Sequence, residues 1–136
     1  MAHSLQFSDL QKGHSFARFP FLVTAEEVAA YLESTGESPD AWREHVPPIF
    51  IDALAIAELL ATVAIPKGVM HTGQEHQTHR PARIGEPLEM EMRVSALSER
   101  RGAVMAVFEA DLHDTDALPV ATMTISVMVL PEGATV

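Results

Sequence analysis

Residues 49–65 have the sequence IFIDALAIAELLATVAI, which is apolar at every position except Asp52, Glu58 and Thr62. Prolines stand on both sides of this stretch, so the pattern predicts one long helix over Ile49–Ile65. A helix that is apolar on nearly every face is normally buried inside a protein. The two acidic residues and the flanking prolines make the stretch too interrupted to span a bilayer, so we expect no membrane segment.

The second half of the chain alternates apolar and polar residues, as half-buried strands do. Short turns separate the alternating runs, which favours an antiparallel meander. The expected strands cover residues 69–80, 88–94, 104–112 and 120–130. One apolar helix and one curved sheet must bury each other's apolar faces. The sequence therefore predicts a single α+β domain over residues 1–136, a long central helix wrapped by an antiparallel sheet, which is the architecture called a hot dog.

A shorter helix is expected over Thr24–Thr35, before the apolar one. Its first residue and Glu27 have the spacing of a capping box, and Gly36 stands where a helix C-cap is expected. One further helical turn is expected over residues 39–44. Residues 16–23 are apolar and are expected to form either a short strand or an extended arm.

Composition excludes several classes of function. The 136 residues include nine Lys and Arg against 19 Asp and Glu, which gives a formal net charge of −10. Such an acidic chain has no electrostatic footprint for nucleic acid and no polybasic patch for a membrane surface. It contains no cysteine, so disulfides, thiolate nucleophiles and cysteine metal sites are excluded. The first residues lack the pattern of a signal peptide, and we expect a cytoplasmic location.

The most informative motif follows the first long expected strand. It consists of His79-Arg80-Pro81, then Arg83, then Gly85-Glu86. Two further stretches, Phe21–Glu27 and Pro47–Phe50, precede the two expected helices. In this order and spacing the motifs resemble the MaoC-like dehydratase family, in particular its fungal-synthase-type N-terminal dehydratase domain. The resemblance covers roughly residues 18 to 130.

This resemblance implies a function. It implies a hot-dog fold, a dimer, and a thioester substrate carried on coenzyme A or acyl carrier protein. The implied reaction is the reversible addition of water to a trans-2-enoyl thioester, with no cofactor. Active members use an Asp and a His with four residues between them, in a Gly-Asp-x-Asn-Pro-x-His loop after the first helix. A helix N-terminus supplies the donor for the thioester carbonyl.

The corresponding loop, residues 36–45, departs from that pattern because Glu37 stands in place of the aspartate. Asp40 and His45 nevertheless have the Asp-x4-His spacing. One hypothesis is that they form the catalytic dyad, as base and acid. The other is that Asp40 lies in the first turn of a short helix, where the dipole favours it, and that His45 lies near its exposed end.

The family also contains degenerate members that complete an active partner. The second hypothesis is therefore a non-catalytic hot-dog subunit that completes an active partner chain. The expected assembly is a homodimer or a heterodimer with a second hot-dog chain. A third hypothesis is a thioesterase with Glu58 as its carboxylate. The predicted substrate-binding residues are Pro48, Phe50, His71, His79 and Arg80.

Three histidines within nine residues raise the question of a metal site. On an extended strand side chains alternate, so His71, Glu75, Gln77 and His79 are expected on one face and His76 on the other. His71 and His79 would then be roughly 26 Å apart, too far to hold one ion. We therefore expect no metal site.

Overall fold

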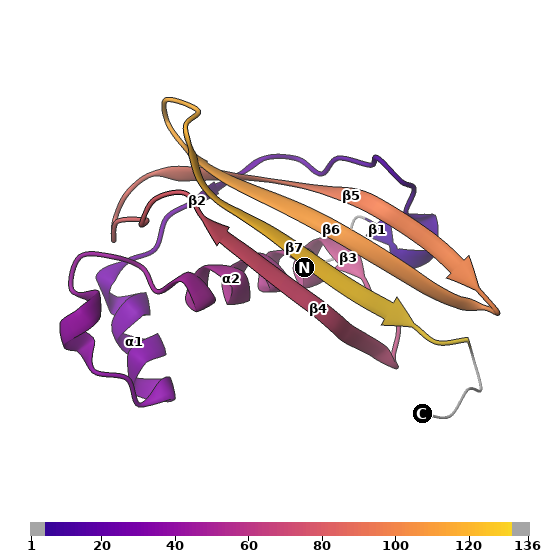
Figure 1. Cartoon of the computed structure of the whole chain (residues 1–136), viewed down its shortest axis with the longest axis horizontal. Coiled ribbons are helices and arrows are strands. Elements are labelled where there is room, and N and C mark those ends of the chain that lie inside the picture. Colours follow the sequence, from indigo (N-terminus) through magenta and orange to yellow (C-terminus); the bar gives the residue numbers. More distant parts are fainter. Residues whose placement is uncertain (1–4, 132–136) are drawn as a thin grey trace.

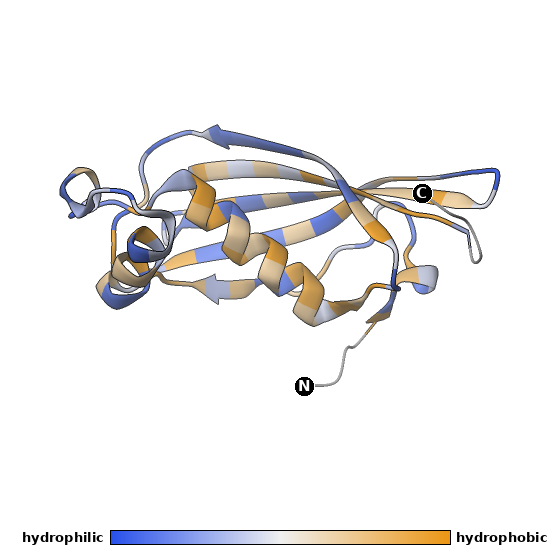
Figure 2. Cartoon of the chain, turned by 90° about the horizontal axis from the view of Figure 1, so that it is seen from below, coloured by the Kyte–Doolittle hydropathy of each residue, from blue (hydrophilic) through white to orange (hydrophobic). Residues whose placement is uncertain are grey.

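The computed structural model describes residues 5–131 and has one antiparallel sheet of five strands at its centre (Figure 1). The strand order is β2-β5-β6-β7-β4, so the expected meander is confirmed for the three central strands. The strands are β2 (Phe19–Phe21), β4 (Val69–Thr78), β5 (Leu88–Arg100), β6 (Ala103–Asp114) and β7 (Pro119–Val129). The sheet curves, and the helices lie against one of its faces (Figures 1 and 2).

The long apolar helix is α2 (Pro48–Thr62), which ends three residues earlier than predicted. Residues 63–64 form a short strand, β3 (Val63–Ala64), which pairs in parallel with β1 (Leu5–Gln6). The predicted end at Ile65 was wrong because the apolar pattern continues through β3, and only pairing with a segment near the N-terminus makes these residues extended. No helix among residues 5–131 is long and apolar enough to cross a membrane.

The core lies between α2 and the inner face of the sheet. Every second side chain is buried over residues 88–94 of β5, 106–112 of β6 and 121–127 of β7, which confirms the predicted alternation in these segments. Helix α2 contributes Ile51, Ala55 and Leu59 to this core. Figure 2 shows the helix crossing the sheet, with apolar residues along nearly its whole length. This arrangement is the predicted hot-dog fold.

Helix α1 (Ala25–Thr35) forms as the capping signals predict. The Thr24 side chain accepts a hydrogen bond from the backbone N–H of Glu27, and the Glu27 carboxylate accepts one from the N–H of Thr24. Gly36 ends the helix with a φ of 75°, a left-handed conformation that glycine adopts without strain. One 3-10 turn, η2 (Pro39–Trp42), follows where a helical turn was predicted.

The two edges of the sheet differ. At one edge β2 pairs with β5, and residues 13–16 extend this cover through backbone hydrogen bonds such as that from the Phe16 N–H to the Met92 carbonyl. At the other edge lies β4, which pairs with β7 on one side only. Among the described residues, no strand pairs with the outer side of β4. Such an edge is a template for pairing with another chain.

Phe108 tests this packing, because its side chain is fully buried at the centre of β6. We expect Phe108→Ala to lower the free energy of unfolding by about 3–5 kcal/mol, through lost burial and a cavity. The control is Met105→Ala on the same strand, where the side chain is 43% exposed and the loss should stay below about 1 kcal/mol. Urea unfolding of both variants measures the difference. Equal losses would contradict this account of the core.

Candidate active site

A carboxylate and an imidazole meet between the central helix and the edge strand of the sheet. Asp52 on α2 and His76 on β4 lie 2.8 Å apart, from Oδ1 to Nδ1. Only 13% and 14% of their side chains are exposed. A buried carboxylate is costly unless it is paired, and His76 supplies the partner. The sequence predicts His76 on the opposite face of the strand from the other histidines, but it assigns no role to Asp52 or His76.

The hydrogen bonds assign the tautomer of His76. An ionised carboxylate only accepts, so the neutral imidazole carries its proton on Nδ1 and donates it to Asp52. The other nitrogen, Nε2, lies 2.9 Å from the Thr78 hydroxyl and accepts from it. Nε2 is therefore the basic atom, and Asp52 holds it in that state.

This pair adjoins a small, largely apolar cavity of about 160 Å³. His76 and Thr78 supply polar groups to its wall, and the first turn of α2 lies at the same place. Its other lining residues are Trp42, Val46, Pro48, Ile51, Arg80, Pro81, Ala82 and Ala121. A basic imidazole nitrogen beside an enclosed apolar space is suited to proton transfer on a bound organic substrate.

The start of α2 brings positive potential to this cavity. Pro48 is the first residue of the helix and has no N–H, and the N–H groups of Phe50 and Ile51 bond to the Pro47 carbonyl. Within the described residues no hydrogen bond is recorded from the N–H of Ile49. The helix dipole favours negative charge at this end, as a polarised carbonyl oxygen would carry.

Asp40 and His45 are not brought together by a hydrogen bond in the described part of the chain. Asp40 lies in the first turn of η2, where its side chain is 74% exposed and its carboxylate accepts from Arg43 at 2.8 Å. His45 is half-buried and forms an isolated backbone bridge with Arg83. Asp40 thus takes the position that the dipole hypothesis expected. The catalytic role of the pair remains a prediction.

The expected grouping of the histidines on β4 was wrong for His71, whereas His76 lies on the opposite face from Glu75 and Gln77 as predicted. A register shift between His71 and Gly73 turns His71 toward the inner face, where it lies 3.0 Å from the Gln74 amide oxygen. A bulge of this kind reverses the alternation that the sequence analysis assumed. His79 follows the end of the strand and lies 3.0 Å from the Thr122 hydroxyl.

The other predicted binding residues have structural contacts. Pro48 lines the cavity, and the Phe50 ring stacks on Tyr31 of α1 with centroids 4.6 Å apart. The Arg80 guanidinium binds both carboxylate oxygens of Glu86, at 3.0 and 2.5 Å, and lies 3.1 Å from Asp114. Their roles in substrate binding remain predictions.

The Arg80 cluster shifts the pKa of each of its members. The side-chain hydrogen bond from Arg80 lowers the pKa of Glu86 below its ordinary value of 4.5. Backbone hydrogen bonding from Leu118, together with Arg80, lowers the pKa of Asp114, and the two carboxylates raise the pKa of Arg80. The cluster joins the segment before β5 to the end of β6, beside the cavity.

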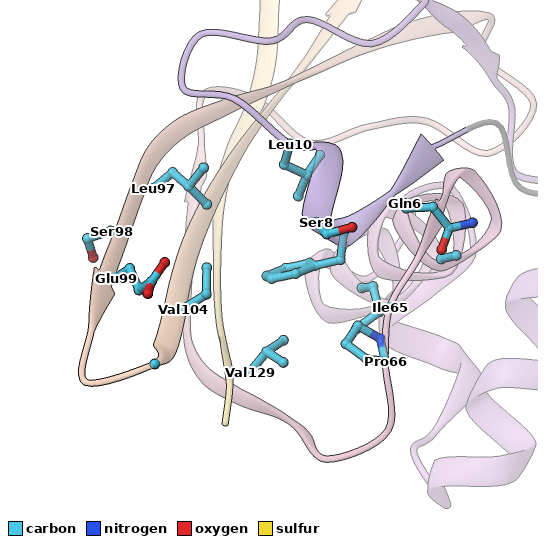
Figure 3. Close-up of a pocket in the computed structure, with 13 residues that line it drawn as sticks. Gln6, Ser8, Leu10, Ile65, Pro66, Leu97, Ser98, Glu99, Val104 and Val129 are labelled. Atoms are coloured by element: carbon cyan, nitrogen blue, oxygen red, sulfur yellow. The ribbon is translucent and has the colours of Figure 1, made fainter. Parts of the chain in front are cut away.

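A second, larger cavity of about 670 Å³ lies at the other end of α2 (Figure 3). Apolar side chains of the sheet face those of the N-terminal segment and of the loop after β3. They are Leu97, Val104 and Val129 on one side, and Leu10, Ile65 and Pro66 on the other. Glu99 is the single charged residue among the described residues that line it, so this cavity has no acid–base pair. Glu58, the predicted thioesterase residue, lines a third cavity with Phe16 and Met92.

Comparison with known proteins identifies the family. A family model described as "FAS1-like, dehydratase domain region" matches residues 10–123. The chain belongs to this FAS1-like dehydratase family. This match confirms the predicted resemblance to a dehydratase family, and solved structures described as MaoC-like dehydratases share the fold of the chain. No curated protein sequence matches the chain.

Three solved structures show how far the likeness extends. The (R)-hydratase from A. caviae involved in PHA biosynthesis is 22% identical, with a TM-score of 0.67 over 90% of this chain and 98% of that one. The MaoC-like dehydratase from Rhodospirillum rubrum is 18% identical, with a TM-score of 0.70 over 94% and 98%. The HadBC (3R-hydroxyacyl-ACP dehydratase) complex from Mycobacterium tuberculosis is 19% identical, with a TM-score of 0.69 over 86% and 96%. At these identities the likeness establishes the hot-dog fold.

Glu86→Gln tests the Arg80 cluster. Because the folded state lowers the pKa of Glu86, this carboxylate stabilises the fold above pH 4.5 and loses its contribution as the pH falls through the lower, folded value. We expect the variant to be less stable than the wild type by about 1–2 kcal/mol near neutral pH, a figure reduced for the partial solvation of Arg80. The difference in the free energy of unfolding between the wild type and Glu86→Gln should become smaller below pH 4.5.

Chemical denaturation at several pH values measures this difference. Glu99→Gln, at the exposed end of β5, is the matched control and should change stability by less than about 0.5 kcal/mol. A Glu86→Gln effect that grows as the pH falls would contradict the assignment.

Proposed function

We propose that this chain is a hydratase or dehydratase for enoyl and 3-hydroxyacyl thioesters carried on coenzyme A or acyl carrier protein, and that Asp52 and His76 are its acid–base pair. The observation that carries the proposal is the 2.8 Å hydrogen bond between these side chains at the wall of an apolar cavity. Membership of a dehydratase family supports the class of reaction.

The chemistry needs one group that accepts and returns a proton. In hydration, Nε2 of His76 takes a proton from water while the water oxygen bonds to C3 of the trans-2-enoyl group. The C2=C3 electron pair moves toward the thioester carbonyl, and the resulting enolate takes a proton at C2 from the imidazolium. Asp52 stays ionised and stabilises the imidazolium through Nδ1. Dehydration follows the same steps in reverse.

The surroundings supply the other requirements. The Thr78 hydroxyl, 2.9 Å from Nε2, stands where the attacking water would be held. The Ile49 N–H at the start of α2 is a donor for the thioester oxygen, where negative charge develops. A water molecule occupies about 30 Å³ in the liquid, so a cavity of 160 Å³ has room for about five non-hydrogen atoms. We therefore expect a short acyl group of about four carbons.

Asp52→Asn and His76→Gln test the assignment. Either change removes the oriented base, and we expect the kcat/KM for hydration of crotonyl-CoA to fall by about 100-fold or more. Loss of the enoyl absorbance measures the rate. Glu58→Gln, on the same helix but facing another cavity, is the matched control and should keep hydration near the wild-type rate.

The same assay separates this pair from the one that the sequence spacing indicated. Asp40→Asn and His45→Gln should leave hydration nearly unchanged if Asp52 and His76 are the acid–base pair. Loss of activity in these two variants, with activity kept in Asp52→Asn, would overturn our assignment and establish the Asp40–His45 dyad. Thiol release from the same substrate tests the thioesterase hypothesis, in which Glu58→Gln would be the inactive variant.

The second candidate function is a non-catalytic subunit that completes an active hot-dog partner. Two observations favour a partner chain, whether identical or different. The outer side of β4 is covered by no described strand, and the neighbouring helix α2 exposes the apolar residues Ile49, Ala53 and Ala57. The HadBC complex is similar to this chain in fold. Exposure of Asp40 and its ion pair with Arg43 favour this candidate over catalysis through the Asp40–His45 dyad.

Ala57→Arg tests whether a second chain covers α2. In a dimer formed through β4 and α2, the added charge would be buried, and we expect it to weaken association by at least about tenfold. Ala29→Arg, on the exposed side of α1, is the matched control. Sedimentation equilibrium measures both variants. A dimer of unchanged affinity in Ala57→Arg would place the interface elsewhere. An active homodimer would exclude the non-catalytic candidate, whereas a folded but inactive chain would support it.

A further inference from the structure

Three metal-ligating side chains converge on the outer face of the sheet, on the side opposite α2. Glu89 and Glu91 are two residues apart on β5, so they point to the same face, and His113 on β6 lies directly across from Glu89. All three side chains are partly buried; 17% of His113 is exposed. Their positions are separate from the Asp52–His76 pair and from the histidines of β4.

The three ligand atoms lie close together, and one of their separations is that expected around a single ion. One carboxylate oxygen of each glutamate and one ring nitrogen of His113 all lie within 4.8 Å of one another. His113 Nε2 and the Glu89 oxygen Oε1 are 3.4 Å apart. Two ligand atoms about 2.05 Å from one ion, at a tetrahedral angle, are about 3.4 Å apart. The His113 nitrogen and the Glu89 oxygen are therefore already close to where a single ion would hold them, and the Glu91 oxygen lies within 4.8 Å of both.

A cationic group of the chain itself already lies against these carboxylates. The Arg18 guanidinium forms ion pairs with both, with Glu89 at 3.2 Å and with Glu91 through Nε. Its side chain is 65% exposed, so the ion pairs are largely solvated and cost little to break. Nearby, Arg93 forms ion pairs with Glu109 and Asp111. The cation paired with Glu89 and Glu91 is therefore Arg18.

We propose that Glu89, Glu91 and His113 form a binding site for a divalent transition-metal ion, with Zn²⁺ as the preferred class. The imidazole ligand favours Zn²⁺, Co²⁺ or Ni²⁺ over Mg²⁺ and Ca²⁺, which take oxygen ligands. Three protein ligands leave one tetrahedral position open. Glu91 and His113 also line a cavity of about 320 Å³, so a water or an anionic ligand can reach that position. Arg18 swings away when the ion binds.

The experiment uses the full, tag-free chain after treatment with a chelator. Titration with Co²⁺ alone should produce the visible absorption of a four-coordinate ion, and Zn²⁺ should then displace it. His113→Gln should weaken Co²⁺ binding by at least about tenfold, because a direct ligand is lost. His79→Gln, at a histidine outside the cluster, is the matched control and should bind as the wild type does. Glu91→Gln should weaken binding as His113→Gln does.

Arg18→Gln distinguishes a metal site from a purely structural ion-pair cluster. Removal of the competing cation should tighten Co²⁺ binding several-fold, whereas a cluster built only for Arg18 would bind no ion in either form. Circular dichroism checks that each variant is folded. Absence of the Co²⁺ absorption at millimolar concentration in both the wild type and Arg18→Gln would overturn the proposal. Equal binding in His113→Gln and His79→Gln would also overturn it.

Discussion

The structure depends on the burial of one apolar helix against the inner face of a curved sheet. Helix α2 is apolar on nearly every side, so it can lie in water only at a high cost, and the sheet covers it with alternate side chains of β5, β6 and β7. The start of α2 meets β4 at the small cavity, and its Phe50 ring stacks on Tyr31 of α1.

The same burial explains the candidate active site. Asp52 is the one polar residue on the buried side of α2, and a carboxylate there requires a hydrogen-bonding partner. His76 fulfils that need from the edge strand, and its other nitrogen, Nε2, lies 2.9 Å from the hydroxyl of Thr78, which also lines the small apolar cavity. A requirement of folding thus places a hydrogen-bonded carboxylate and imidazole near a helix N-terminus, the arrangement on which the proposed function rests.

The two faces of the sheet divide the molecule by chemistry. The inner face is apolar and holds the acid–base pair at one end and the larger cavity of Figure 3 at the other. The outer face carries charged side chains in cross-strand pairs, including the cluster of Glu89, Glu91 and His113. Because successive side chains of a strand point to opposite faces, the residues of β5 and β6 belong alternately to the inner face and to the charged outer face.

The sequence by itself determined the elements whose signals are local. The capping box and Gly36 bound α1, most of the apolar run forms α2, and the alternating residues 88–94 and 104–112 lie within the longer strands β5 and β6. Motif order was enough to indicate the family. Tertiary structure decided the rest: the end of α2, the register shift that turns His71 inward, and the meeting of Asp52 with His76. These depend on which distant segments pair. A local sequence pattern shows whether a segment is a helix or a strand, but it does not show which distant segment packs or pairs with it. The sequence did contain one signal for this site, because Asp52 is an acidic residue on a helix expected to be buried and therefore needs a partner. The spacing of residues along the chain could not identify that partner as His76.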